Sequence, residues 1–285
     1  MQSKDNVELV DCPRDAIQGI LPFIATSKKI KYINQVLESD LFACIDFGSF
    51  VSPRWVPQMQ DTAEVLAGIN RDNDTKLLAI VANLRGAEQA INTEKLDYIG
   101  YPFSIAETFQ KKNTKSTLDE AKTTVRDIEQ QICRQETTSL IVYLSMAFGN
   151  PYGDPWSVDL LMEWIDQLAA LGVRRFSLSD TTSQATSGLI FEIVNRVILT
   201  YPDLQFSVHL HAHVDDALLK VNAAYDAGCR RFEGAMLGYG GCPFAQDELV
   251  GNIPSEMLVE RFTTGNDSKI KTLKSGFRQL LKHEV

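Results

Sequence analysis

The most distinctive chemical pattern in this sequence is a pair of histidines separated by one residue, His209 and His211. They lie in the run QFSVHLH, which is typical of a β-strand. Residues i and i+2 of a strand point to the same side, so both imidazoles can reach one divalent ion. The alternative interpretation is a pair of hydrogen-bonded histidines in the core. His213 falls beyond the strand, where a helix cap or a surface position is expected.

Two further segments carry groups suited to the same site. Asp15 could add a carboxylate, and two imidazoles with one carboxylate suit Mn²⁺, Fe²⁺ or Zn²⁺, whereas additional oxygen ligands favour Mg²⁺ or Mn²⁺. Arg14 beside it could be a fixed cation for a developing enolate, with an ordinary ion pair as the alternative. Cys242 follows the glycines of GYGGCP, a pattern that predicts either a thiol placed over the site by a mobile loop or a buried cysteine in a turn.

Strand-like and helical segments alternate along the chain and would position these residues. The predicted strands cover residues 7–11, 41–47, 76–82, 96–101, 139–145, 173–179, 205–211 and 229–235. Most are continuous apolar runs, as expected for strands covered on both faces. The repeated alternation predicts a (β/α)8 TIM barrel rather than an open sheet, because no glycine-rich nucleotide-binding motif follows the first strand. We expect one domain over residues 1–285, with the barrel at about 7–251 and C-terminal helices over 252–285.

Polar residues gather at one end of the predicted strands. In a TIM barrel the active-site groups come from the carboxyl ends of the strands and from the loops that follow them. The residues at those positions are Asp15, Asp46, Ser49, Asn83, Ser145, Asp180, His209 and His211. The pattern therefore indicates an active site at this end of the barrel.

The composition of the chain argues against several classes of function. The chain has 28 basic and 37 acidic residues and a net charge of −9, which argues against binding to nucleic acid or to an anionic membrane. No apolar run is long enough to span a bilayer, and the N-terminus lacks the apolar region of a signal peptide. Four scattered cysteines, Cys12, Cys44, Cys133 and Cys229, are expected to fill apolar space. The absence of a CxxC motif favours a reducing compartment, so we expect a cytoplasmic protein.

Several segments resemble, in order, the motifs of the 3-hydroxy-3-methylglutaryl-CoA (HMG-CoA) lyase family, which belongs to the metal-dependent DRE-TIM barrel lyases. They are DCPRDAIQ, GSFVSPRWVPQM, NLRG, SMAFGNPY, SLSDT, HLH and GYGGCPFAQ, and the similarity covers about residues 7–255. The resemblance implies a (β/α)8 barrel, a Mg²⁺ or Mn²⁺ ion and an acyl-CoA thioester substrate. The implied reaction is cleavage of HMG-CoA to acetyl-CoA and acetoacetate. Family precedent also favours a homodimer.

The resemblance also assigns roles to individual residues. The implied metal ligands are Asp15, His209, His211 and Asn252. The implied catalytic residues are Arg14, which would stabilise the enolate, Cys242, which would move protons, and the carboxylates Asp46 and Asp180. The candidates for contacts with the substrate or with CoA are Ser49, Asn83, Ser145, Lys111 and Lys112.

A few positions depart from the family pattern. Asp46 stands where the family usually has glutamate, Cys12 where it has glycine, and Ala212 where it has aspartate. The stretch TSQATSG replaces a pattern of glycine and proline. The changed neighbours favour two alternatives: a lyase for a related 3-hydroxy-acyl-CoA, and a catalytically weak barrel that acts as a binding protein. A Claisen-type synthase of the same wider group is a further alternative.

Overall fold

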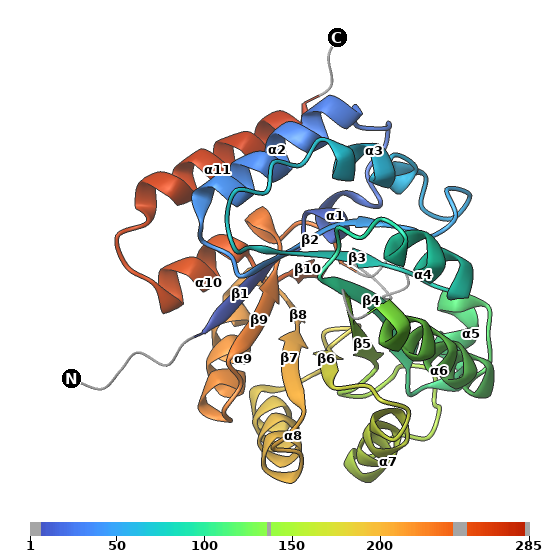
Figure 1. Ribbon diagram of the computed structural model, residues 1–285. Coiled ribbons are helices and arrows are strands. Elements are labelled where there is room, and N and C mark those ends of the chain that lie inside the picture. Colours follow the sequence, from blue (N-terminus) through green and yellow to red (C-terminus); the bar gives the residue numbers. More distant parts are fainter. Residues whose placement is uncertain (1–6, 136–137, 242–249, 283–285) are drawn as a thin grey trace.

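Eight parallel strands form a closed barrel in the computed structural model, which describes residues 7–135, 138–241 and 250–282 (Figure 1). The barrel strands, in spatial order, are β1 (Glu8–Asp11), β2 (Cys44–Ser49), β3 (Lys76–Ile80), β4 (Tyr98–Ser104), β5 (Ser139–Ser145), β6 (Arg175–Ser179), β7 (Gln205–His209) and β9 (Arg231–Gly234). Because β9 also pairs in parallel with β1, the ring is complete. The predicted (β/α)8 barrel is confirmed.

Helices surround the barrel, and the first and shortest of them lies at its mouth. They are α1 (Pro13–Ile17), α2 (Thr26–Ser39), α3 (Thr62–Ala67), α4 (Leu84–Ile91), α5 (Glu107–Thr114), α6 (Leu118–Gln135), α7 (Val158–Ala169), α8 (Ser187–Thr200), α9 (Val214–Asp226), α10 (Ser255–Phe262) and α11 (Asp267–Leu281), with short 3-10 turns at Pro57–Met59 and Met236–Gly238. No helix among the described residues is both long and apolar enough to cross a bilayer.

The apolar residues form two layers, which explains why the strands read as continuous apolar runs. A small cluster of six buried residues contains no helical residue and lies inside the barrel: Val10, Cys12, Cys44, Leu78, Ile141 and Tyr143. A much larger cluster joins the outer faces of the strands to the helices. The strands are therefore buried on both sides, as expected for a parallel barrel.

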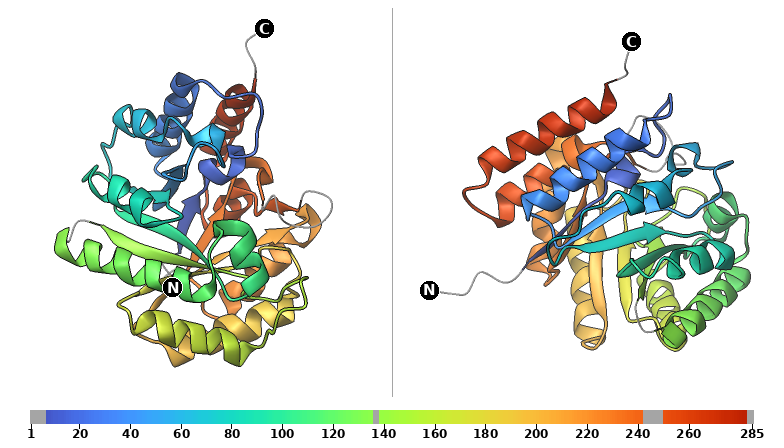
Figure 2. Two further views of the ribbon diagram at one scale, coloured as in Figure 1. Left: turned by 90° about the vertical axis from the view of Figure 1, so that its right-hand side faces the viewer. Right: turned by 45° about the horizontal axis from the view of Figure 1, so that its top comes forward.

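The two C-terminal helices complete the outer layer. Helix α10 packs against β1 and β9, and α11 lies alongside α2 at the other end of the sequence (Figure 2). In this contact the rings of Tyr32 and Phe277 have their centroids 5.4 Å apart. Within the segment predicted as C-terminal helices, the described residues form these two helices, whereas Asn252 belongs to the short strand β10 (Gly251–Asn252).

Apart from shifts of a few residues at strand ends, such as β2 at Cys44–Ser49 instead of 41–47, the structure differs from the sequence predictions in the following features. The strand predicted over 205–211 ends at His209, and His211 begins a separate short strand, β8 (His211–Ala212). That strand pairs in antiparallel fashion with β10 (Gly251–Asn252), a second sheet too short to give a sequence pattern. Cys133 is exposed on α6, so its prediction as a buried filler was wrong, whereas Cys12, Cys44 and Cys229 are buried.

Candidate metal centre and active site

His209 and His211 stand side by side at the carboxyl end of β7. His209 is the last residue of that strand and His211 the first residue of β8. Their ring centroids are 5.0 Å apart, and both side chains are buried. His213 is placed at the N-cap of α9 and is exposed, as expected. The two histidines of the HLH motif therefore share one environment, and the third lies outside it.

Asp15 completes a three-residue cluster with these histidines. It lies in α1, directly after β1, and is buried. One ligand atom from each of Asp15, His209 and His211 lies within 4.8 Å of the others. A carboxylate and two imidazoles at this spacing can hold a divalent ion.

Asn252 reaches the cluster through the small sheet. Its backbone pairs with His211, and its amide nitrogen donates to the Asp15 carboxylate at 2.6 Å and to the Tyr239 carbonyl at 2.8 Å. Among the described residues, Asn252 Oδ1 and His211 Nε2 are buried polar atoms without a hydrogen-bond partner. Buried polar atoms are rarely left unpaired, and a cation between them would satisfy both. The donor set therefore fits a divalent ion.

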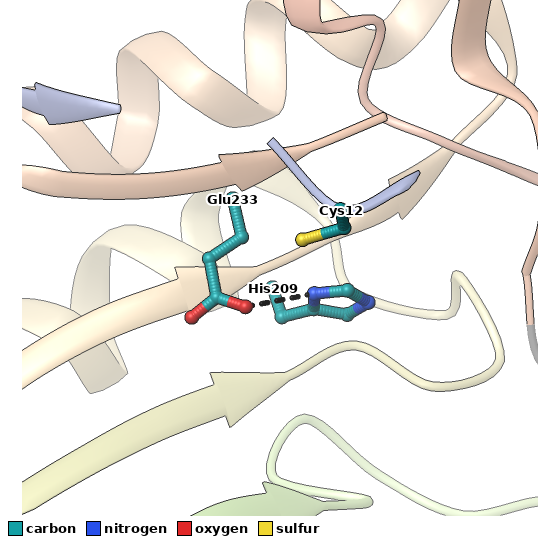
Figure 3. Close-up of side chains that lie close together, drawn as sticks. All are labelled: Cys12, His209 and Glu233. Carbon is teal, nitrogen blue, oxygen red and sulfur yellow. Dashed lines mark hydrogen bonds and ion pairs between the residues drawn. The ribbon is translucent and has the colours of Figure 1, made fainter. Parts of the chain in front are cut away.

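Neighbouring acceptors orient both imidazole rings. His209 Nδ1 lies 3.1 Å from the Glu233 carboxylate (Figure 3), and His211 Nδ1 lies 3.0 Å from the Asp180 carbonyl oxygen. Because both partners accept hydrogen bonds, each Nδ1 donates and each Nε2 keeps its lone pair. This is the usual arrangement of histidines that bind a metal through Nε2.

Charges and burial set the protonation of the cluster. Burial, together with the charge of His209, lowers the pKa of His211 to about 4, so this ring is neutral at physiological pH. Burial also opposes the charge of His209, but the hydrogen bond to Glu233 and the nearby carboxylates outweigh it and raise the pKa of His209. Burial likewise opposes the charge of Asp15, yet the Arg14 cation and the two histidines lower its pKa. Asp15 is therefore an anion facing two imidazoles.

Arg14 is held between two carboxylates. Its Nη2 lies 2.6 Å from Asp46 Oδ2, its Nε also donates to Asp46, and its Nη1 donates to Asp15 at 3.0 Å. Gln18, a residue that the sequence analysis missed, bridges the pair by accepting from Arg14 and donating to Asp15. The guanidinium is buried and fixed beside the candidate metal ligands, so Arg14 is both an ion-pair partner and a positioned cation. Asp46, despite its short side chain, reaches Arg14.

Asp180 sits behind His211 and directs its carboxylate away from the ligand cluster. One of its carboxylate oxygens accepts from Lys220 at 2.7 Å, and the other from the backbone of Ala185. Lys220 also donates to the His211 carbonyl oxygen at 2.9 Å. Burial raises the pKa of Asp180 although the lysine opposes that effect. The structure therefore brings the Asp180 backbone, and not its carboxylate, to the candidate ligands.

Besides Gln18, two other contributors to the site, Glu233 and Lys220, are absent from the sequence prediction. Glu233 accepts from Ser177 and Ser207 at 2.8 Å each and is the only acidic residue of β9. Lys220 occupies the buried face of α9 together with Ala217, Val221 and Ala224. A charged residue inside an apolar pattern is a signal of a buried partner, but it does not identify that partner.

The candidates for substrate contacts lie outside the ligand cluster. Ser49 and Ser145 are the buried last residues of β2 and β5, and Asn83 caps α4 by accepting from Gly86 at 2.9 Å. Lys111 pairs with Glu107 at 2.7 Å, and Lys112 lies 4.2 Å from the ring centroid of Tyr152. Cys242 lies outside the described residues.

Comparisons with a family model, with known sequences and with solved structures all lead to the same family. The HMGL-like family model matches residues 6–276. The chain is 30% identical to hydroxymethylglutaryl-CoA lyase YngG of Bacillus subtilis over 87% of this chain and 81% of that protein. It is 31% identical to human mitochondrial hydroxymethylglutaryl-CoA lyase over 87% of this chain and 75% of the relative. The structure of an HMG-CoA lyase from Acinetobacter baumannii, in complex with coenzyme A and 3-methylmalate, matches with a TM-score of 0.90 and 30% identity, over 100% of this chain and 94% of the other.

Proposed function

The chain belongs to the HMGL-like family, and from this membership we propose that it is a divalent-metal-dependent lyase that cleaves HMG-CoA to acetyl-CoA and acetoacetate. The observation that carries the proposal is the buried cluster of Asp15, His209 and His211 at the mouth of the barrel. The family relationship supports the proposed reaction. The cluster supplies side chains that can bind the divalent ion this reaction requires.

The ion would be held by Asp15, His209, His211 and Asn252. Carboxylate and amide oxygens suit Mg²⁺, and imidazole nitrogens extend that preference to Mn²⁺, so we propose one of these two ions. When bound, such an ion supplies Lewis acidity that lowers the pKa of the tertiary hydroxyl of the substrate.

Arg14 would stabilise the charge that develops on the departing thioester. A retro-aldol cleavage leaves negative charge on the carbonyl oxygen of the acetyl group, and a fixed cation stabilises that charge more than it stabilises the neutral ground state. Asp46 holds Arg14 through two of its nitrogens, which limits the guanidinium to one orientation. We therefore assign Arg14 to charge stabilisation and Asp46 to the positioning of Arg14.

Proton transfer is assigned to Cys242 on the resemblance of the GYGGCP segment. A thiol with an ordinary pKa of about 8.5 can exchange protons near neutral pH once a neighbouring cation lowers that pKa. We assign Asp180 a positioning role, because its carboxylate pairs with Lys220 while its backbone oxygen accepts from His211.

The acyl-CoA contacts are proposed for the residues around the mouth of the barrel. Ser49, Asn83 and Ser145 follow or end strands on the side of the candidate metal ligands. Lys111 and Lys112 are exposed on α5, where they would meet phosphate groups of CoA. A homodimer and a cytoplasmic location stay predictions from the sequence.

A lyase for a related 3-hydroxy-acyl-CoA is the second candidate. It is favoured by Ala212, which is buried next to His211 and offers no carboxylate, and by Asp46, which is shorter than the usual family glutamate. A panel of acyl-CoA thioesters that vary at the carbon bearing the hydroxyl separates the two candidates, because the preferred substrate is cleaved with the highest kcat/KM.

The proposal is tested by measuring acetoacetate and acetyl-CoA released from HMG-CoA by metal-stripped protein, with and without added Mg²⁺ or Mn²⁺. We expect metal-dependent cleavage in the unaltered chain and its loss in His211→Ala and Cys242→Ser. His213→Ala is the matched control, because His213 is exposed and lies outside the cluster. Equal activity in His211→Ala and His213→Ala would contradict the assigned metal site.

A further inference from the structure

A second set of metal-binding side chains lies on the other side of His209. One ligand atom from each of Cys12, His209 and Glu233 lies within 4.8 Å of the others, and all three side chains are buried. Figure 3 shows the Cys12 thiol and the Glu233 carboxylate on the side of the ring that carries Nδ1. This set shares only His209 with the ligands described above, and its cysteine stands where the resembled motif has glycine.

The chemistry of this set differs from that of the Asp15 cluster. A thiol, an imidazole and a carboxylate are the ligand types that bind Zn²⁺, and sulfur favours thiophilic ions over Mg²⁺. Mg²⁺ also gives up its water reluctantly, which disfavours it in a site where the exposed fractions are 0% for Cys12 and 3% for Glu233. The second set therefore selects a different class of ion.

Glu233 is already oriented for such a role. Its Oε1 accepts from the hydroxyls of Ser177 and Ser207 at 2.8 Å each, which leaves Oε2 directed at His209 Nδ1. The Cys12 sulfur lies within 4.8 Å of the ligand atoms of His209 and Glu233, and its side chain is fully buried. An ion between these atoms would contact the sulfur, the carboxylate and the imidazole together.

We propose that Cys12, His209 and Glu233 form a binding site for a thiophilic divalent ion such as Zn²⁺, and that an ion bound there excludes the catalytic ion. The reason is the shared imidazole, since a neutral ring has one lone pair and offers it either at Nε2 or at Nδ1. Binding at Nδ1 moves the ring proton to Nε2, replaces the S–H bond by a bond from sulfur to the ion, and releases one proton to solvent. The thiophilic ion is thus an inhibitor of the metal centre.

Co²⁺ is the probe for this site, because a thiolate bound to Co²⁺ gives a charge-transfer absorption that oxygen and nitrogen ligands do not give. Metal-stripped full-length protein is titrated with Co²⁺. We expect the thiolate absorption in the unaltered chain and its loss in Cys12→Ser. Cys44→Ser, at another buried cysteine of the barrel interior, and Cys242→Ser are the controls and should keep it. No thiolate absorption in the unaltered chain, or its survival in Cys12→Ser, would overturn the proposal.

A displacement experiment tests the exclusion of the catalytic ion without using lyase activity. Protein loaded with Mn²⁺ is titrated with Zn²⁺, and released Mn²⁺ is measured by electron paramagnetic resonance. Circular dichroism first establishes that Cys12→Ser is folded. We expect half-displacement in Cys12→Ser to need at least about tenfold more Zn²⁺ than in the unaltered chain. Equal Zn²⁺ requirements would show that Zn²⁺ merely replaces Mn²⁺ at the Asp15 cluster, and the proposal would be wrong.

Discussion

Asn252 lies directly opposite His211 in the two-stranded sheet formed by β8 and β10. This pairing brings Asn252 against Asp15, which is 237 positions away in the sequence, with a hydrogen bond of 2.6 Å. The sheet therefore connects the first and last parts of the chain at the candidate metal centre.

Replacing Asn252 tests how much this residue contributes to metal binding. We expect Asn252→Ala to weaken Mn²⁺ binding by about tenfold, because an oxygen ligand and a hydrogen bond to Asp15 are lost together. The measurement is a Mn²⁺ titration followed by electron paramagnetic resonance. Asn92→Ala, at an exposed position after α4, is the control and should bind Mn²⁺ normally. Unchanged affinity in Asn252→Ala would remove Asn252 from the ligand set.

Because Gly240 has no side chain, the backbone at this position can pass close to Asp15 and Asn252. Its φ is +88°, and a Cβ added there would lie 2.5 Å from the Asp15 carbonyl oxygen and 2.9 Å from Asn252 Nδ2. We expect Gly240→Ala to lower Mn²⁺ affinity by about tenfold or more, because the backbone of Asp15 must shift. Gly265 also has a positive φ, +77°, but an added Cβ meets open space there. Gly265→Ala should therefore lose some stability and keep its Mn²⁺ affinity; a similar loss of affinity in both variants would contradict this explanation.

We expect Glu233 to couple metal binding to pH through His209, since its carboxylate contacts that ring at 3.1 Å. The Glu233 carboxylate raises the pKa of His209, so protons compete with the metal ion up to a higher pH than they would without it. In Glu233→Gln this pKa falls, and the pH below which the Mn²⁺ dissociation constant begins to rise should move to a more acidic value. Above that range the variant should bind Mn²⁺ about 10–100-fold more weakly, because the ring is less well oriented and less basic.

The measurement for Glu233 is the Mn²⁺ dissociation constant from mildly acidic to mildly basic pH. Glu192→Gln, at an exposed position of α8, removes the same charge far from the site and should follow the unaltered chain. If the dissociation constant of Glu233→Gln began to rise at a higher pH than that of the unaltered chain, the carboxylate would not act through the pKa of His209.

Lys220 and Asp180 form a buried ion pair whose loss should be costly. Lys220→Met leaves the Asp180 carboxylate buried without its cation, and we expect the free energy of unfolding to fall by about 3–5 kcal/mol. The double variant with Asp180→Asn removes the stranded charge and should recover part of that loss. Urea denaturation measures all three proteins, with Lys271→Met on the exposed face of α11 as the control. A double variant less stable than Lys220→Met would argue against a charge effect.

Much of the fold follows from local patterns in the sequence. The run SLIVYLS predicts a strand buried on both faces, and β5 covers the same seven residues, Ser139–Ser145. The HLH motif predicts two imidazoles on one side, and His209 and His211 do lie together. These features depend on residues within a few positions of one another. Such local relationships are visible in the periodicity of the sequence.

The remaining features depend on partners distant in sequence. Glu233 contacts His209 across 24 positions, and Lys220 contacts Asp180 across 40, and no periodicity connects such residues. The pairing of β8 with β10 is also too short to leave an alternating pattern. The sequence thus indicates at which end of the barrel the candidate ligands gather, whereas the hydrogen bonds that orient each of them appear only in the folded chain.

The most direct test of the central claim is a parallel measurement of bound Mn²⁺ and HMG-CoA cleavage on one preparation of metal-stripped protein. We predict that acetoacetate formation is absent without the ion, rises in proportion to bound Mn²⁺ and saturates at one ion per chain. Cleavage by protein free of metal, or Mn²⁺ bound in full without any cleavage of HMG-CoA, would contradict the account.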